Sequence, residues 1–206
     1  MKAKALVASV YVVDDEIDVL DSISILLDAL GLNVKCYTSA EAFLKNYQPS
    51  ETECLILDVM MPTMSGLDLQ TAMLQHGISM PIIFISGHSG IPESARAFRA
   101  GAVHFLEKPF DYDQLKECIS EALGKSQEYR DDFICKLKAS VLVQQLTERE
   151  REILLLITQG HANKDIAKRL NISTRTVEAH RFHIKEKTQA TSLAELTTLV
   201  IHAQLI

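Results

Sequence analysis

The sequence predicts an α/β domain with a doubly wound, five-stranded parallel sheet, followed by an all-α domain of four helices. Over residues 1–124, short apolar segments alternate with segments of helical apolar spacing, and continuously apolar strands are typical of a parallel sheet covered on both faces. Beyond residue 140 only helical spacing recurs. The net charge also changes, from −9 over residues 1–124 to +3 over residues 125–206, which indicates two modules with different partners.

Five short runs of mostly β-branched, aliphatic and aromatic residues are the expected strands. They are residues 10–13, 33–37, 54–57, 82–85 and 103–106. The segments between and after them have the apolar spacing of helices. The expected helices are residues 17–30, 39–46, 67–75, 92–100 and 112–123. Ser39 is expected to cap the second helix, and Gly31 and Gly101 to end the first and the fourth.

A connector is expected over residues 125–141, between a first domain at 8–124 and a second at 142–206. In it an apolar residue recurs every four positions, which predicts a helix that extends the preceding one. These residues are Tyr129, Phe133, Leu137 and Val141. Two interpretations remain open: the apolar residues form a dimer seam, or they pack on their own domain.

The second domain is predicted to contain helices only. Thr147 with Glu150 three residues later has the pattern of a capping box, and Gly160 ends the helix that follows. Two helices joined by the turn 171–173 come next, and a last helix closes the chain. These three helices are residues 163–170, 174–187 and 193–203.

Length and composition suit one or two compact cytoplasmic domains. The chain has 206 residues, 47% of them apolar and 23% charged, as in ordinary globular proteins. No apolar run approaches the ~20 residues that a membrane-spanning helix needs, so no membrane partner is expected. The four cysteines form no CxxC pair, which argues against a zinc site and a disulfide framework.

Polar residues follow four of the five expected strands. Asp14 and Asp15 follow the first strand, Asp58 the third, Ser86 the fourth and Lys108 the last. The carboxyl ends of parallel strands share one edge of the sheet, where doubly wound folds bind ligands. Converging carboxylates favour Mg²⁺, and a carboxylate beside a metal, an ammonium and a hydroxyl can attack a phosphoryl group. Asp58, the central acid, is the candidate nucleophile.

Four short motifs at these strand ends resemble the receiver domain of two-component response regulators. The resemblance covers about residues 8–124 and implies a flavodoxin-like fold. The motifs are Val13-Asp14-Asp15-Glu16, Leu57-Asp58-Val59-Met60-Met61-Pro62, Ile85-Ser86-Gly87-His88 and Glu107-Lys108-Pro109-Phe110. A phosphatase of the dehalogenase type would need a second acid two residues after the nucleophile, where this chain has Met60.

The resemblance implies a Mg²⁺ site formed by Asp14, Asp15, Asp58 and the backbone carbonyl of Met60. It also implies that a sensor histidine kinase phosphorylates Asp58.

Further roles follow from the same resemblance. Lys108 and Ser86 would contact the phosphoryl oxygens, and Phe105 would be the switch aromatic that turns inward when Ser86 moves. The Lys108-Pro109 bond is expected to be cis. Met60 and His88 match positions that tune the rate of dephosphorylation.

The helices at 163–170 and 174–187 have the proportions of a helix-turn-helix, whose second helix enters the major groove. Val177 and Ile184 are expected to face inward, with Ala167 and Leu170 from the first helix. Spacing alone also allows a plain helical hairpin. The remaining positions are candidate DNA contacts, through phosphate or outward-facing side chains. They are Lys164, Thr174, Arg175, Thr176, Glu178, Ala179, Arg181, Phe182 and Lys185.

The second domain resembles the LuxR-type DNA-binding domain over about residues 142–206. The residues that carry the resemblance are Leu146-Thr147-Glu148-Arg149-Glu150, Gly160, Asn163-Lys164-Asp165-Ile166-Ala167 and Ser173-Thr174-Arg175-Thr176-Val177-Glu178-Ala179-His180. Together the two domains are similar to the NarL/FixJ class, and residues 101–110 to FixJ-type members. Thr188 departs from the family, which usually has an apolar residue there, and this puts the packing at the end of the recognition helix in doubt.

The expected function is that of a phosphorylation-activated transcription regulator rather than an enzyme. Phosphorylation of Asp58 would remodel helix 92–100 and strand 103–106, and two copies would pair through this face, with Ala95, Phe98 and Arg99 as candidate contacts. The expected partners are a sensor histidine kinase, promoter DNA and a second copy of the chain, with RNA polymerase a further candidate. The alternative is a signalling adaptor whose helical domain binds a protein.

Overall fold

The computed structural model describes residues 8–87, 97–99 and 101–205. The chain divides into two compact units, Met1–Arg130 and Asp131–Ile206.

The first unit is built on a five-stranded sheet whose strands are all parallel, in the order β2-β1-β3-β4-β5. The strands are β1 (Ser9–Val13), β2 (Asn33–Tyr37), β3 (Glu53–Asp58), β4 (Ile82–Ser86) and β5 (His104–Glu107). All five expected strands are confirmed, with ends that differ by one residue at most. β1, β3 and β4 are buried along their whole length, as their continuous apolar sequence predicts.

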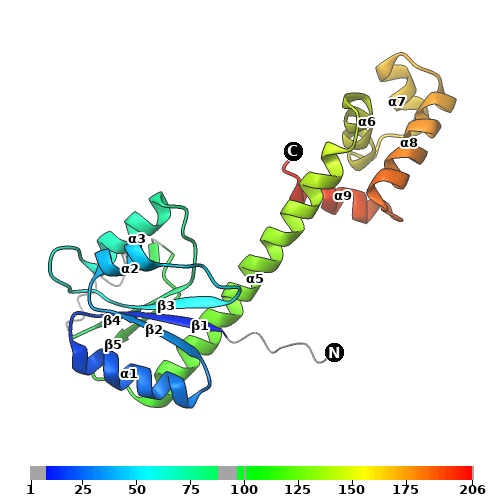
Figure 1. Cartoon of the computed structure of the whole chain (residues 1–206). Helices are drawn as coiled ribbons and strands as arrows, with labels where there is room; N and C mark the ends of the chain where they lie inside the picture. Colours follow the sequence, from blue (N-terminus) through cyan, green and yellow to red (C-terminus); the bar gives the residue numbers. More distant parts are fainter. Residues whose placement is uncertain (1–7, 88–96, 100, 206) are drawn as a thin grey trace. The chain divides into compact units, whose positions relative to one another are not determined.

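Helices cover both faces of this sheet (Figure 1). Their bounds are α1 (Ile17–Ala29), α2 (Ala40–Asn46), α3 (Gly66–Gln75) and α5 (Tyr112–Gln144). One core cluster lies under α2 and α3 and includes Tyr11, Phe43 and Phe84, while the other lies under α1 and the start of α5 and includes Leu27 and Ile119. Ser39 caps α2 as expected, by accepting a hydrogen bond from the backbone N–H of Ala42. The helix expected at 92–100 falls largely outside the described residues, but 97–99 are helical.

α5 is one continuous helix of 33 residues, so the expected helical extension of the helix at 112–123 is confirmed. Within the first unit, a hydrogen bond and an ion pair hold α5 against the start of β3 and the residues just before it. The hydroxyl of Ser126 accepts a 2.9 Å hydrogen bond from the backbone N–H of Glu53, and Arg130 forms a 2.9 Å ion pair with Glu51.

Every element described in the second unit is a helix. After the end of α5 come α6 (Glu148–Thr158), α7 (Asn163–Leu170), α8 (Thr174–Thr188) and α9 (Leu193–His202). The expected capping box of Thr147 and Glu150 is present at the start of α6. Ala139 and Val143 of α5 are buried in the core of this unit, together with Ile153, Ile166 and Val177. In the part of the chain that the structure describes, no helix is both long and apolar enough to cross a bilayer.

Candidate functional site

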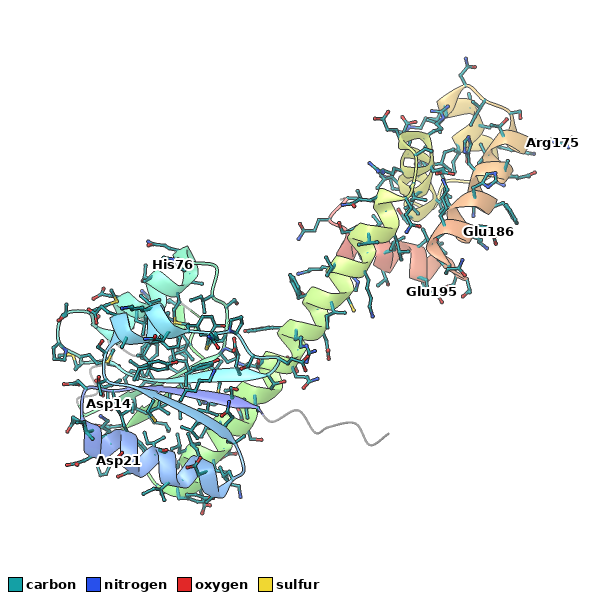
Figure 2. The ribbon with its side chains drawn as sticks, in the orientation of Figure 1. Asp14, Asp21, His76, Arg175, Glu186 and Glu195 are labelled. Carbon is teal, nitrogen blue, oxygen red and sulfur yellow. The ribbon has the colours of Figure 1, made fainter. Side chains whose placement is uncertain are left out.

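The carboxyl edge of the sheet brings the expected polar residues together. Asp14 follows β1, Asp58 ends β3, Ser86 ends β4 and Lys108 follows β5. Figure 2 shows Asp14 at this edge, where β1 gives way to the loop before α1. The crevice between β1 and β3 is also the point where the chain reverses its order in the sheet, which is where ligands bind in doubly wound folds.

Lys108 joins the two buried acids of this edge. Its Nζ lies 2.8 Å from Oδ2 of Asp14 and 2.9 Å from Oδ1 of Asp58. The other oxygen of each acid accepts a backbone N–H: that of Glu16 at 2.9 Å for Asp14, and that of Met60 at 2.6 Å for Asp58. Asp14 is fully buried and Asp58 is 4% exposed, so their orientation depends on these hydrogen bonds.

Burial and hydrogen bonding act in opposite directions on the pKa values of Asp58 and Lys108. Burial raises the pKa of Asp58 above its usual value despite the hydrogen bond from Lys108, and the negative charge of Asp14 adds to the increase. Burial lowers the pKa of Lys108, but its hydrogen bonds to Asp14 and Asp58 outweigh this and raise the pKa. Lys108 is therefore an ammonium at neutral pH.

The donor set of this edge suits a hard dication. Two buried carboxylates share one ammonium, and Oε1 of Glu16 lies 3.5 Å from the same Nζ, so negative charge is in excess. Asp15, on the same loop, is exposed. Carboxylate oxygens are the ligands that Mg²⁺ prefers. Among the described residues, however, no group of three or more His, Cys, Asp and Glu side chains is placed so that it could hold a metal ion.

The other residues expected at this edge lie as follows. Ser86 is fully buried, and its carbonyl accepts a 2.7 Å hydrogen bond from the backbone N–H of Lys108. Phe105 is half-buried and packs on Phe84, with 6.4 Å between the ring centroids. The bond between Lys108 and Pro109 is cis, as expected.

Of the candidate dimer contacts, Phe98 and Arg99 are exposed. The third candidate, Ala95, lies outside the described residues. His88, which was expected to tune the rate of dephosphorylation, lies outside them as well.

Gly66 supports the site and was missed by sequence reasoning. A Cβ at this position would overlap the backbone carbonyl oxygen of Asp58, and the N–H of Gly66 donates a 3.0 Å hydrogen bond to the carbonyl of Val59. The start of α3 thus rests directly on the backbone that carries Asp58. The sequence signals only a helix start here, since the contact spans a loop whose path the residues do not reveal.

The second candidate site is the pair α7 and α8. Asn171 ends α7 in the left-handed conformation at φ 52°, which asparagine tolerates, and Ser173 caps α8 by accepting the N–H of Thr176 at 3.0 Å. Val177 and Ile184 are fully buried, as expected for the inner face. The chain therefore has the helix-turn-helix that the spacing predicted.

The outer face of this pair carries the candidate DNA contacts. Eight of them are exposed, and only Arg181 is half-buried. The exposed ones are Lys164, Thr174, Arg175, Thr176, Glu178, Ala179, Phe182 and Lys185. Figure 2 shows Arg175 projecting away from the body of the unit. The Thr176 N–H is taken by the Ser173 cap, which leaves the first N–H groups of α8 for an anion.

Two contacts that sequence reasoning missed fix the ends of these helices. Lys187 donates a 2.6 Å hydrogen bond to Glu150, and Arg149 donates a 2.7 Å hydrogen bond to the carbonyl of Leu170 at the end of α7. Burial would raise the pKa of Glu150, but the hydrogen bonds from Lys187 and Thr147 together outweigh it and lower the pKa.

Thr188, the residue that departs from the family pattern, is buried with its hydroxyl satisfied. It donates a 2.7 Å hydrogen bond to the carbonyl of Ile184. The end of α8 is therefore packed despite the polar residue.

A sheet edge with two acids around one lysine, followed by a helix-turn-helix, defines a response regulator with a DNA-binding domain. The model of the "Response regulator receiver domain" family matches residues 10–120, and that of "Bacterial regulatory proteins, luxR family" matches residues 144–200. The chain belongs to the two-component response regulators of the NarL/FixJ class, which are transcriptional regulators and not enzymes.

Individual relatives agree with this assignment. The response regulator protein TmoT of Ectopseudomonas mendocina is 42% identical over 189 residues, which are 91% of this chain and 85% of TmoT. The transcriptional regulatory protein FixJ of Azorhizobium caulinodans is 38% identical over 194 residues, 94% of this chain and 92% of FixJ. The solved structure of the response regulator StyR matches with a TM-score of 0.79 at 38% identity, covering 94% of this chain and 98% of StyR.

Proposed function

We propose that the chain is a phosphorylation-activated transcription regulator in which Asp58 is the phosphoacceptor. The observation that carries the proposal is the position of Lys108, whose ammonium touches both Asp58 and Asp14. A cation at this point can contact the oxygens of a phosphoryl group on Asp58 and offset their charge.

The proposed step is transfer of a phosphoryl group from a phosphohistidine of a sensor kinase. A carboxylate oxygen of Asp58 bonds to phosphorus while the P–N bond breaks, and the imidazole leaves and takes up a proton. Lys108 follows the transferred charge, and Ser86 moves toward the phosphate so that its hydroxyl donates to a phosphoryl oxygen. Phe105, which packs on Phe84, turns inward as Ser86 moves.

Receiver domains typically use Mg²⁺ for this step, and the donor set described above suits it. Asp14, Asp15, Asp58 and the carbonyl of Met60 would hold the ion. When bound, the ion supplies positive charge next to the phosphoryl oxygens. Lys108 would then be released from Asp14 toward the phosphate.

For the output we propose promoter DNA, with α8 in the major groove. Thr174, Arg175, Thr176, Glu178, Ala179 and Phe182 face the bases or the nearest phosphates, and Lys164, Arg181 and Lys185 contact phosphates along the strands. Ala179 and Phe182 offer apolar contacts only, so they carry little base code. Two copies would pair through Ala95, Phe98 and Arg99 only after Asp58 is phosphorylated.

The proposal also assigns boundaries, partners and location. The receiver domain would span residues 8–124, the linker 125–141 and the DNA-binding domain 142–206. The partners would be a sensor histidine kinase, promoter DNA and a second copy of the chain, with RNA polymerase a further candidate. The place of action would be the cytoplasm, where promoter DNA lies.

The test of the phosphoacceptor is Asp58→Asn with labelled acetyl phosphate as donor. The wild-type chain should incorporate label, and Asp58→Asn should not. Asp28→Asn is the matched control, because Asp28 is exposed near the far end of α1. Persistent labelling of Asp58→Asn would refute the assignment.

A promoter-DNA shift assay with and without phosphorylation tests the output. Phosphorylated wild type should bind more tightly than the untreated protein, and Asp58→Asn should show no such gain. An adaptor that docks a protein would show no DNA shift in either state.

A further inference from the structure

One acid stands among the exposed side chains of α8 that are proposed to meet DNA. Glu178 is exposed, and the residues that surround it on the helix surface are three, four and seven positions away. Four of these neighbours are also exposed and are candidate DNA contacts: Thr174, Arg175, Phe182 and Lys185. A duplex that contacts these side chains therefore meets the carboxylate of Glu178 as well.

The burial of α8 fixes the side of the helix on which Glu178 stands. Val177 and Ile184 are fully buried in the core of the helical unit. Each residue of an α-helix advances by about 100°, so Glu178 lies about 100° around α8 from Val177 and about 120° from Ile184. Glu178 therefore belongs to the outer face and not to the margin of the core.

In the described part of the chain, no side chain neutralises the carboxylate of Glu178. Arg175 and Arg181 each lie three residues from it, which is the spacing of a helical ion pair. Neither of them is paired with it, and none of the ion pairs between described residues includes Glu178. Glu150 of the same unit, by contrast, is paired with a lysine. The oxygens of Glu178 are therefore available to a ligand.

A carboxylate at this place finds few hydrogen-bond donors on a duplex. Phosphates repel it, and N7, O6 and O4 of the base edges are acceptors like itself. The donors in the major groove are the amino groups of cytosine, N4, and of adenine, N6. Adenine N6 stands beside the acceptor N7, a pattern that suits an amide side chain, whereas cytosine presents N4 alone. Cytosine is therefore the base that a glutamate matches.

We propose that Glu178 accepts a hydrogen bond from the N4 amino group of a cytosine in the major groove and so determines one base of the DNA site. The role rests on the proposed function of the helix-turn-helix, and it supplies base code that Ala179 and Phe182 do not. Glu178 lies in the second turn of α8, within the N-terminal part of a recognition helix that contacts base edges. Repulsion by phosphate disfavours all other sequences, where no amino group offsets it.

The experiment is selection of binding sites from a pool of random duplexes by the full chain treated with acetyl phosphate. Competition binding on each single-base variant of the selected site follows. Wild type should select cytosine at one position for each bound α8, and any other base there should weaken binding by about 10-fold. Glu178→Gln should prefer adenine at that position, because an amide matches N6 and N7 together. Glu178→Ala should accept all four bases there about equally.

Glu186→Gln is the matched control. Glu186 is exposed on α8 about two turns beyond Glu178, and its substitution removes the same charge. The selected sequence should not change in this variant. If Glu186→Gln relaxes the same position, the effect is one of charge alone and the contact with cytosine is overturned. Far-UV circular dichroism of each variant verifies that it is folded.

Two further outcomes separate this contact from the proposed function. If both Glu178 variants select the same bases as wild type, or if the position they change holds a base other than cytosine in the wild-type site, the contact is refuted while DNA binding stands. If wild type enriches no duplex at all, the proposed function is refuted and the role of Glu178 with it.

Discussion

Lys187, in the last turn of α8, donates a 2.6 Å hydrogen bond to Oε2 of Glu150, in the first turn of α6. The same oxygen accepts the backbone N–H of Thr147 at 2.8 Å, as part of the capping box. One carboxylate thus stabilises the start of α6 and the position of α8, the second helix of the helix-turn-helix. Glu150 is almost fully buried, whereas about a third of the Lys187 side chain is exposed.

Lys187→Met should reduce the free energy of unfolding of the helical unit by about 2 kcal/mol, because it leaves a buried carboxylate without its charged donor. The measurement is urea unfolding followed by far-UV circular dichroism. Tyrosine fluorescence would not report on this unit, since all five tyrosines lie in residues 1–130 and the chain has no tryptophan.

Lys185→Met is the matched control for this substitution. Lys185 is exposed and makes its proposed contact with DNA only. Its replacement should leave stability unchanged, weaken binding about equally on all DNA sequences, and reduce the slope of log K against log salt by about 0.9. An unchanged salt slope would count against the phosphate contact, and equal losses of stability in both variants would count against the anchoring role of Lys187.

Acid should weaken the same contact. The pKa of Glu150 is lowered in the folded chain, so the folded state binds a proton there less readily than the unfolded state. This contribution is complete above the ordinary glutamate pKa of about 4.3 and is lost as pH falls through the lowered value. Glu150→Gln should be less stable than wild type at neutral pH and approach it in acid. Parallel pH profiles of the two proteins would contradict this expectation.

Gly66→Ala should destabilise the first unit by about 1–3 kcal/mol, because the added methyl group overlaps the carbonyl of Asp58. It should also slow labelling by acetyl phosphate, since that backbone must shift. Gly124→Ala is the opposite case. Gly124 lies within α5 with open space around it, and alanine there should stabilise the helix by about 0.5–1 kcal/mol. Urea unfolding followed by tyrosine fluorescence measures both, and equal signs would refute the steric argument.

Asn171→Val should destabilise the helix-turn-helix by about 1–2 kcal/mol, because a β-branched residue is strained at the φ of 52° that ends α7. Asn171→Gly should be close to neutral, since glycine adopts this conformation without strain. Thermal unfolding followed at 222 nm compares the two. Equal losses would show that the asparagine side chain, and not the backbone conformation, is what the turn requires.

The sequence predicts the architecture well because local signals are strong here. Continuous apolar runs mark β1, β3 and β4, and side-chain caps mark the starts of α2 and α6. The candidate site could also be predicted, because the carboxyl ends of parallel strands always share one edge. To predict this site it is enough to recognise that four residues stand at strand ends: Asp14, Asp58, Ser86 and Lys108.

Strand direction and local periodicity are enough to predict, from the residues alone, which side chains gather at the sheet edge and which residues of α8 face outward. Three contacts are visible in the folded chain alone: Lys108 bridges Asp14 and Asp58, Gly66 touches the backbone of Asp58, and Lys187 reaches Glu150. These contacts join segments that lie far apart in the chain. Their geometry depends on loop paths and helix packing, which no short pattern encodes.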